Sequence, residues 1–326
     1  MFRKLVLIML GLALVLSACG SSQSTNAAGT LTKITLPMGY IPNIQFAPFY
    51  VAVEKGYFKN AGIELAFDYK FETDGVALVG AGQLPFAVVS GEQVLLARAK
   101  QLPVTYVAAW YQQYPVSVVA KSELGIVVPQ DLKGKKIGIP GLFGASYVGL
   151  RALLNAGKLK ESDVTLDTIG FNQVDLMAAG QQNIVVGYTG NEPILLHAKG
   201  IAVTELRVSD YAQLAANGIL ASEKVIKENP QLVRAFVGAF LKGLQDTISN
   251  PDEAFTISAK YIPNFSQLDA KVQKQVLTTS IEEWQAKRLG YSDPQAWENM
   301  QNVLLDMSLL TEKQDLSKAF TNEFIP

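Results

Sequence analysis

The sequence predicts an α/β fold of two related lobes, joined by a hinge and followed by a helical C-terminal part. A strand–helix–strand pattern occurs twice, over Lys33 to Tyr69 and over Lys135 to Phe171. A second pattern, in which the tripeptide AGQ precedes a strand and a helix, also occurs twice, at 81–100 and 179–199. After Glu223 the apolar residues keep helical spacing. Repeated units of this kind indicate related lobes.

The first strand–helix–strand unit begins with a strand over Lys33 to Leu36, which Pro37 ends. The run FAPFYVAVEKGYF then has the apolar spacing of a helix that ends near Gly56, and Ile63 to Tyr69 is the next strand. A connection through a helix favours parallel pairing of the two strands.

The second unit contains a glycine loop between its strand and its helix. The segment KKIGIPGLFGASYVGLR predicts a short strand, a G-x-x-G-x-x-G loop and a helix over Tyr147 to Asn155, followed by a strand over Val164 to Phe171. Backbone N–H groups at such a helix start can hold an anion or a carbonyl oxygen. A tight connection without a ligand explains the glycines equally well. The spacing matches neither the dinucleotide fingerprint nor the phosphate loop.

The two AGQ units agree in register. Strand FAVVSG and helix EQVLLARAK in the first correspond to strand IVVGYTG and helix NEPILLHAK in the second. Glu92 thereby corresponds to Glu192, and a Leu-Leu pair follows each glutamate. Chance similarity of two β–α units is the alternative, but the shared register favours two related lobes.

Two crossings between the lobes are predicted. Val104 to Lys121 holds two apolar runs around WYQQYP, and a return is expected at Gly218 to Ala221. Paired crossings form a hinge. They place lobe 1 at 33–117 plus 219–326 and lobe 2 at 118–218. Amphipathic spacing then predicts scaffold helices over 232–248, 254–261, 268–284 and 295–310.

The first thirty residues predict export and lipid attachment. Arg3 and Lys4 precede an apolar block that is too short for a membrane-spanning helix, so residues 1–18 are the expected signal peptide. The segment LSAC matches the lipobox of bacterial lipoproteins, which makes Cys19 the acylated first residue; an ordinary signal peptide with a chance cysteine is the alternative. Small polar residues at 19–32 suit a tether. We expect an extracytoplasmic protein that is held to the cell membrane by this lipid alone.

Composition argues against most catalytic sites. Hydrolytic triads and most transition-metal sites need His or Cys, yet Cys19 is the only cysteine and His197 the only histidine. We therefore expect no catalytic residue and no metal site. The formal charge of −1 becomes −3 when Arg3 and Lys4 are removed, which gives no basic surface for nucleic acid. With 49% hydrophobic residues the chain can bury a large core.

Candidate binding residues lie in loops that follow strands, where open α/β sheets place ligands. Tyr and Trp offer a flat apolar face with one hydrogen-bonding group, which suits a planar aromatic ligand better than a bare ion. Structural roles are the alternative: Tyr188 can cover a sheet edge, and the two paired glutamates can complement helix N-termini. The predicted ligand-binding residues are Asn43, Phe46, Ser90, Glu92, Trp110, Tyr111, Tyr114, Gly144, Ser146, Tyr147, Tyr188, Asn191 and Glu192.

Several segments together resemble the thiamine-precursor-binding branch of bacterial solute-binding proteins for ABC importers. They are LSAC, IPNIQFAPFYVAVEKGYF, the AGQ units, DLKGKKIGIPG and GYTGNEP. The resemblance covers Lys33 to Pro326 and implies the type II periplasmic-binding-protein fold. It also implies a small molecule that is held between the lobes and delivered to a membrane permease. We expect a monomer with no cofactor apart from the bound ligand.

Within that branch, GIPGLFGASYVGLRALL, GEQVLLARA and NEP look like the riboflavin-binding members. We expect such a ring to lie between aromatic side chains, with the backbone N–H groups of Gly144 to Ser146 at its carbonyl oxygens and Asn191 or Glu192 at its polar edges. A thiamine pyrimidine precursor such as formylaminopyrimidine is the alternative ligand, and a sulfonate or nitrate ranks below it. Pyrimidine synthases of the same fold use a histidine and a cysteine-rich motif, which this chain lacks around Gly187 to Gly190. An enzyme and a purely structural lipoprotein are the remaining rivals.

Overall fold

A computed structural model describes residues 30–326. The predicted signal peptide at 1–18, Cys19 and the tether up to residue 29 lie outside the described residues. The strands are β1 (Thr32–Pro37), β2 (Ile63–Asp68), β3 (Phe86–Val89), β4 (Val104–Ala109), β5 (Val116–Lys121), β6 (Lys136–Ile139), β7 (Thr165–Thr168), β8 (Ile184–Tyr188), β9 (Val203–Arg207) and β10 (Gly218–Ser222).

Helices connect these strands and form the C-terminal part. They are α1 (Ala47–Glu54), α2 (Tyr57–Asn60), α3 (Glu72–Gly80), α4 (Gly91–Ala99), α5 (Gly144–Ala156), α6 (Gln173–Ala178), α7 (Glu192–Ala198), α8 (Glu223–Glu228), α9 (Pro230–Ser249), α10 (Pro251–Ser258), α11 (Ala270–Trp284), α12 (Pro294–Asp306) and α13 (Leu316–Ala319). None of the helices within residues 30–326 is long and apolar enough to cross a membrane.

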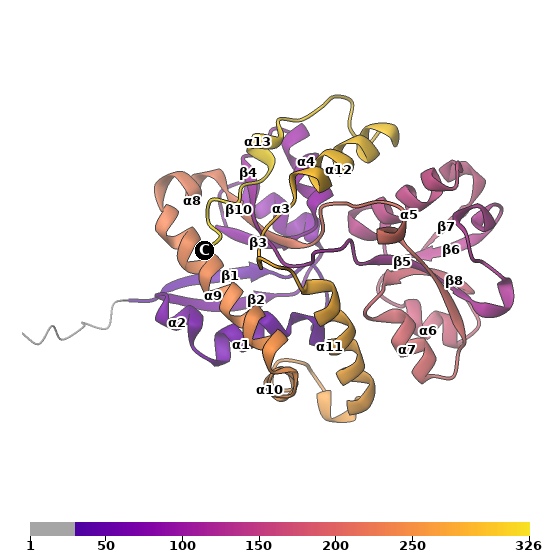
Figure 1. The fold of residues 1–326 in the computed structure, drawn as a ribbon, viewed down its shortest axis with the longest axis horizontal. Coiled ribbons are helices and arrows are strands. Elements are labelled where there is room, and N and C mark those ends of the chain that lie inside the picture. The colour runs from indigo at the N-terminus through magenta and orange to yellow at the C-terminus, as the bar shows by residue number, and fades with distance from the viewer. Residues whose placement is uncertain (1–29) are drawn as a thin grey trace, which may run out of the picture. The chain divides into compact units, whose positions relative to one another are not determined.

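The strands form two groups with the same internal order. In the first lobe β1 pairs with β2, β1 lies beside β3, and β10 lies between β3 and β4. In the second lobe the order is β7-β6-β8-β5-β9. Each group therefore has a parallel pair of strands at one edge, β2 with β1 or β7 with β6. Each also has one antiparallel strand that adjoins a crossing between the lobes, β10 or β5. The predicted two-lobe α/β fold and its parallel pairs are confirmed (Figure 1).

The chain crosses between the lobes twice. It passes from β4 in the first lobe to β5 in the second, and it returns from β9 to β10. The first crossing lies within the predicted stretch Val104 to Lys121, whereas the return runs over 208–217 and so precedes the predicted stretch Gly218 to Ala221, which belongs to β10. The exact division into 33–117 plus 219–326 and 118–218 stays a prediction, and its limits fall inside β5 and beside the first residue of β10.

The C-terminal helices pack mainly on the first lobe. Helix α9 lies along α1 (Figure 1), where Phe49 and Phe240 stack with ring centroids 4.7 Å apart. Gly243 permits this close approach, because a Cβ at that position would lie 2.2 Å from the Pro48 carbonyl oxygen. Full burial of a Phe side chain contributes about 1.5–3 kcal/mol to the free energy of folding. The contact therefore holds α9 against the first lobe as a structural helix, as its apolar spacing predicts.

Helix α3 is the main element that the sequence pattern does not predict. It holds Gly75 and ends at Gly80, and each glycine costs helix stability of about 1 kcal/mol. Tertiary packing overrides this cost: a Cβ on Gly75 would lie 2.8 Å from the Pro37 side chain, so the glycine allows α3 to lie against β1. The helix places Glu72 beside the site described next.

Candidate ligand-binding site

A cavity lies among the loops that follow the strands of both lobes. It comprises about 820 Å³ of space that protein atoms do not fill, part of which is open to solvent. The first lobe contributes loop 38–46, the start of α3, Val88 and Trp110 to Tyr111; the second contributes loop 140–146, Phe171, Gln173 and the segment from Tyr188 to Glu192.

Aromatic rings form the inner wall of the cavity. Trp110 lies 5.6 Å from Phe46 and 4.8 Å from Tyr111, measured between ring centroids. Tyr111 in turn meets Tyr188 of the second lobe edge to face at 6.3 Å. The wall thus presents flat apolar surfaces from both lobes, which is the chemistry that holds a planar ring.

A second aromatic group lies at the solvent side of the cavity. Phe71, which is 37% exposed, meets Phe143, which is 42% exposed, at 5.2 Å and nearly at right angles. Phe171 lies 4.7 Å from Tyr40 and 5.3 Å from Phe71. Tyr40 and Phe71 belong to the first lobe, whereas Phe143 and Phe171 belong to the second. These contacts therefore connect the two lobes over the cavity.

Polar groups of the second lobe face the same space. The backbone N–H of Tyr188 donates to Glu192 Oε2 at 2.7 Å, and Asn191 Nδ2 donates to Glu192 Oε1 at 3.2 Å. Burial raises the pKa of Glu192 above its ordinary value. Because its oxygens already accept these bonds, Glu192 offers a fixed acceptor edge to a ligand N–H or O–H group.

Helix α5 starts at the cavity. Gly144 begins it with φ of +72°, a left-handed conformation that favours glycine. The preceding residue, Phe143, makes no side-chain capping bond. The first N–H groups of a helix have no intrahelical acceptor, and Gly144 to Ser146 line the cavity. This arrangement suits a ligand carbonyl oxygen or anionic group.

Two neighbouring carboxyl groups, those of the half-buried Glu72 and the buried Glu92, lie on the first-lobe side. Asn217 Nδ2 donates to Glu72 Oε1 at 2.9 Å, and Ser90 Oγ lies 2.5 Å from Glu72 Oε2. Ser90 Oγ also hydrogen-bonds to Glu92 Oε1. Burial raises the pKa of Glu72 to about 8, with a further contribution from the neighbouring Glu92. Burial also raises the pKa of Glu92.

These shifts predict that the protein is less stable at alkaline pH. The folded pKa of Glu72 lies above its ordinary value, and burial raises that of Glu283 to about 8 as well. Between the ordinary glutamate pKa of 4.5 and about 8, the folded state holds more protons than the unfolded state. The free energy of unfolding therefore falls as pH rises toward 8, by about 1.4 kcal/mol per pH unit for each such proton, and levels off above 8. Urea denaturation at pH 6 and pH 9 measures this change. An equal or larger free energy at pH 9 contradicts it.

The structure brings together eight of the thirteen predicted binding residues. The residues that line the cavity are Phe46, Trp110, Tyr111, Gly144, Ser146, Tyr188, Asn191 and Glu192. They come from the four predicted loops after β1, β4, β6 and β8. Their contact with a ligand stays a prediction.

Five predicted residues lie outside the cavity lining. Asn43 accepts a hydrogen bond from the Gln45 backbone N–H and so caps the short helical turn at 44–46. Ser90, Glu92 and Tyr114 are buried behind the wall, where they bond to one another. Tyr147 donates to Glu161 Oε2 at 2.5 Å and accepts from Arg151, so its hydroxyl belongs to a charged cluster. The expectation that Tyr147 touches the ligand is therefore not supported by its placement.

Several lining residues lie outside the predicted set. Phe71 and Phe171 follow β2 and β7, and Glu72 starts α3. The rule that ligands meet the loops after strands identifies the first two once it is applied to the strands ending at Asp68 and Thr168. Asn217 precedes β10 and carries no such signal.

No group of three or more His, Cys, Asp and Glu residues within 30–326 is arranged to hold a metal ion. His197, the single histidine, is exposed near the end of α7 and does not line the cavity.

The fold and the position of the cavity define a two-lobe protein of the periplasmic-binding-protein type. The alkanesulfonate-binding protein SsuA from Xanthomonas axonopodis pv. citri has the same fold, with a TM-score of 0.71 at 14% identity, over 89% of this chain and 98% of that one. The chain belongs to the family described as NMT1/THI5 like, whose model matches residues 43–254.

Two relatives carry names of binding proteins. The riboflavin-binding protein RibY of Chloroflexus aurantiacus is 43% identical, over 99% of this chain and 98% of that protein. A formylaminopyrimidine-binding protein of Halalkalibacterium halodurans is 26% identical, over 91% and 92%. Other relatives, in Legionella pneumophila and Saccharomyces cerevisiae, are named 4-amino-5-hydroxymethyl-2-methylpyrimidine phosphate synthases, at 25% and 26% identity.

Proposed function

We propose that this protein is the solute-binding component of an ABC import system and that its ligand is riboflavin. The observation that carries the proposal is the aromatic cavity between the lobes, in a chain that is similar over nearly its whole length to a riboflavin-binding protein. A tricyclic ring needs flat apolar faces on both sides and a few fixed polar groups at its edges. The described cavity supplies both kinds of surface.

Different lining residues would contact different parts of the ligand. Trp110, Tyr111 and Tyr188 offer ring faces and edges from both lobes. The free N–H groups at the start of α5 suit the ring carbonyl oxygens, and Glu192 suits a ring or side-chain donor. Contact with both lobes at once favours the closed arrangement, because a ligand stabilises the conformation to which it binds more tightly.

The proposal extends to the cellular setting. Residues 1–18 would be removed, lipid attached at Cys19 would hold the protein at the outer face of the cell membrane, and the closed monomer would dock on the permease. Lipid attachment is tested by metabolic labelling with a fatty acid, with Cys19→Ala as the unlabelled control.

A thiamine pyrimidine precursor is the second candidate ligand. It is supported by the relative that is named for formylaminopyrimidine and by the carboxyl groups of Glu72 and Glu192 at the cavity, which can accept bonds from amino groups. A synthase activity is the weaker alternative, since the only histidine lies away from the cavity and the only cysteine at position 19.

A thermal-shift screen separates these candidates. Riboflavin, flavin mononucleotide, formylaminopyrimidine, nitrate and an alkanesulfonate are added separately to the purified protein. A ligand that binds only the folded state raises the melting temperature. We expect the largest rise with riboflavin. A rise with formylaminopyrimidine and none with riboflavin would replace the proposed ligand, and no rise with any of the compounds would contradict the function.

Paired tyrosine substitutions test the aromatic wall. Tyr188→Ala removes a ring that lines the cavity, whereas Tyr147→Ala removes a ring that bonds to Glu161 elsewhere. We expect Tyr188→Ala to weaken riboflavin binding by about 1–3 kcal/mol, the scale of base–aromatic stacking, or roughly 5- to 150-fold. Tyr147→Ala should leave the affinity unchanged. Isothermal titration calorimetry measures both, and equal losses in the two variants would place the ring elsewhere.

A further inference from the structure

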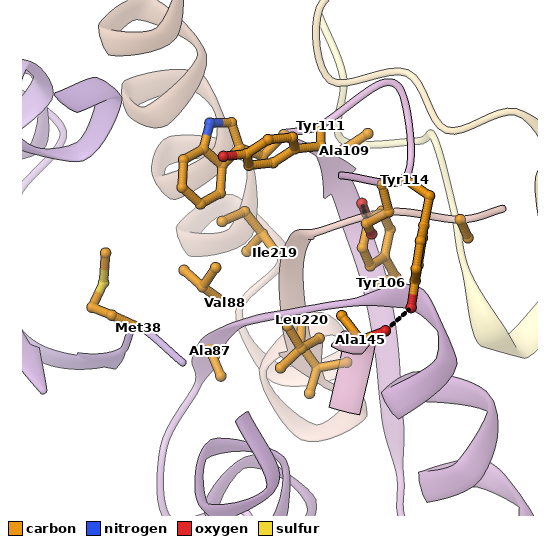
Figure 2. Close-up of a cluster of buried hydrophobic side chains, with 14 of the residues drawn as sticks. Met38, Ala87, Val88, Tyr106, Ala109, Tyr111, Tyr114, Ala145, Ile219 and Leu220 are labelled. Carbon is orange, nitrogen blue, oxygen red and sulfur yellow. Dashed lines mark hydrogen bonds between the residues drawn. The ribbon is translucent and has the colours of Figure 1, made fainter. Parts of the chain in front are cut away.

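A chain of hydrogen bonds runs beside the cavity from the first lobe to the second. It begins at Glu72 on α3, passes through Ser90 to Glu92 on α4, and continues to Tyr114 in the crossing between β4 and β5. Tyr114 ends the chain at the carbonyl oxygen of Ala145 on α5, at 3.1 Å. Figure 2 shows this last bond as the dashed line between Tyr114 and Ala145.

The chain contains four oxygen–oxygen contacts and needs one hydrogen for each. Ser90 Oγ contacts both Glu72 and Glu92, and Tyr114 Oη lies 3.0 Å from Glu92 Oε2 and 3.1 Å from the Ala145 oxygen. A hydroxyl group donates one hydrogen, and a carboxylate or carbonyl oxygen donates none. Ser90 and Tyr114 therefore supply two of the four hydrogens. The other two must come from protonated carboxyl groups of Glu72 and Glu92.

The direction of each bond then follows. Glu72 Oε2–H donates to Ser90 Oγ, Ser90 donates to Glu92 Oε1, Glu92 Oε2–H donates to Tyr114 Oη, and Tyr114 donates to Ala145. If Glu92 loses its proton, Tyr114 must donate to the carboxylate instead, because a charged acceptor forms the stronger bond. The bond to the second lobe is then lost.

Among residues 30–326, no Lys, Arg or His side chain is paired with these carboxyl groups to favour their charged form. Glu72 bonds to Asn217 and to the Ser90 backbone N–H, and Glu92 bonds to Gln93. The other titratable groups that face them are phenols: Tyr106 on β4, Tyr188 on β8 and Tyr114 itself. Within residues 30–326, neither glutamate forms an ion pair with Lys, Arg or His. Burial accordingly raises the pKa of both carboxyl groups.

We propose that closure of the two lobes is linked to a proton: the Tyr114–Ala145 bond forms only while Glu92 carries its proton, so that loss of this proton loosens the lobes and weakens ligand binding. The ligand in this inference comes from the proposed function. The protonation of Glu92 comes from the count of hydrogens in the chain of hydrogen bonds. Closure takes up a proton, and alkaline pH therefore favours the open arrangement.

Glu92→Gln provides the test, because glutamine resembles the protonated glutamic acid in shape and does not ionise. Its Nε2–H can donate to Tyr114, and its Oε1 can accept from Ser90. Small-angle X-ray scattering of the ligand-free protein is recorded from pH 6 to pH 9. We expect the radius of gyration of the unchanged protein to increase with pH and that of Glu92→Gln to stay constant.

The control is Glu283→Gln. Glu283 is another carboxyl group whose pKa is raised to about 8, but it is half-buried and lies on α11, outside the chain of hydrogen bonds. This variant should keep the pH response of the unchanged protein. The inference is overturned if the unchanged protein shows no expansion, if Glu92→Gln expands equally, or if Glu283→Gln abolishes the expansion.

Riboflavin affinity is measured over the same pH range. We expect the affinity of the unchanged protein to fall about tenfold or more between pH 6 and pH 9, and that of Glu92→Gln to stay level. Any titration of riboflavin itself affects both proteins equally. If riboflavin binds neither protein at any pH, the proposed ligand is wrong, and the scattering comparison alone then supports or overturns the proton linkage.

Discussion

Trp110→Ala is expected to lower the free energy of unfolding by about 3–5 kcal/mol, the usual cost of truncating a buried tryptophan. Trp110 is only 3% exposed and packs against Phe46, Phe49, Tyr111 and Trp284. Because the same ring lines the cavity, riboflavin affinity should fall as well. Urea denaturation and a riboflavin titration, at a temperature where the variant remains folded, measure the two losses.

Trp297→Ala separates packing from ligand contact. Trp297 is fully buried, stacks on Phe320 and lies outside the cavity lining. We expect a comparable loss of stability with riboflavin affinity retained in the folded protein. If both variants lose affinity equally, the effect of Trp110 on binding is a consequence of general destabilisation.

Gly218→Ala is expected to destabilise the return crossing strongly. A Cβ at Gly218 would lie 2.1 Å from Tyr106 Oη and 2.2 Å from the Ala108 carbonyl oxygen. The side chain of Tyr106 can move only by breaking its bond to the Ala216 oxygen, and the Ala108 oxygen belongs to the paired strand β4. The loss should reach about 3 kcal/mol, the upper part of the range for overpacking. Thermal unfolding monitored by circular dichroism measures it.

Gly238→Ala is the matched control, since it adds the same methyl group. Gly238 lies in the middle of α9, where nothing stands within 4 Å of the added Cβ. Alanine favours a helix over glycine by about 0.5–1 kcal/mol, so this variant should be more stable than the unchanged protein. Equal effects of the two substitutions would contradict the steric explanation.

The sequence predicts much of this architecture because its signals are local. The apolar runs and AGQ units locate β3, β8, α4 and α7, and helical spacing locates α9. Packing interactions that involve distant residues leave weaker traces. Helix α3 is hidden by its glycines, which the structure explains through distant neighbours: Gly75 makes room for Pro37, and Gly80 makes room for Leu102.

The site is predictable to a similar extent. Loop position after a strand identifies Trp110, Tyr188 and Asn191, because strand ends converge at one edge of a sheet. It does not give the direction of a side chain. Tyr147 lies one residue after Ser146 in α5, and the helical turn carries its ring away to Glu161 and Arg151.

Glu92 and Glu192 occupy equivalent positions in the sequence repeat but have different positions relative to the cavity. Glu92 and Glu192 correspond in the repeat and are both buried beside their helix starts. Glu192 lines the cavity, whereas Glu92 lies behind Ser90 and bonds toward Tyr114. The difference depends on Glu72 and the crossing segment, for which the second copy of the repeat offers no guide.

The most direct test of the account is a titration of riboflavin with the purified protein, followed by quenching of flavin fluorescence. Stacking on Trp110, Tyr111 or Tyr188 should quench the emission, with saturation at one riboflavin per chain and no reversal by nitrate. Absence of quenching at micromolar protein, together with saturable binding of formylaminopyrimidine, would contradict the assignment of riboflavin as the ligand.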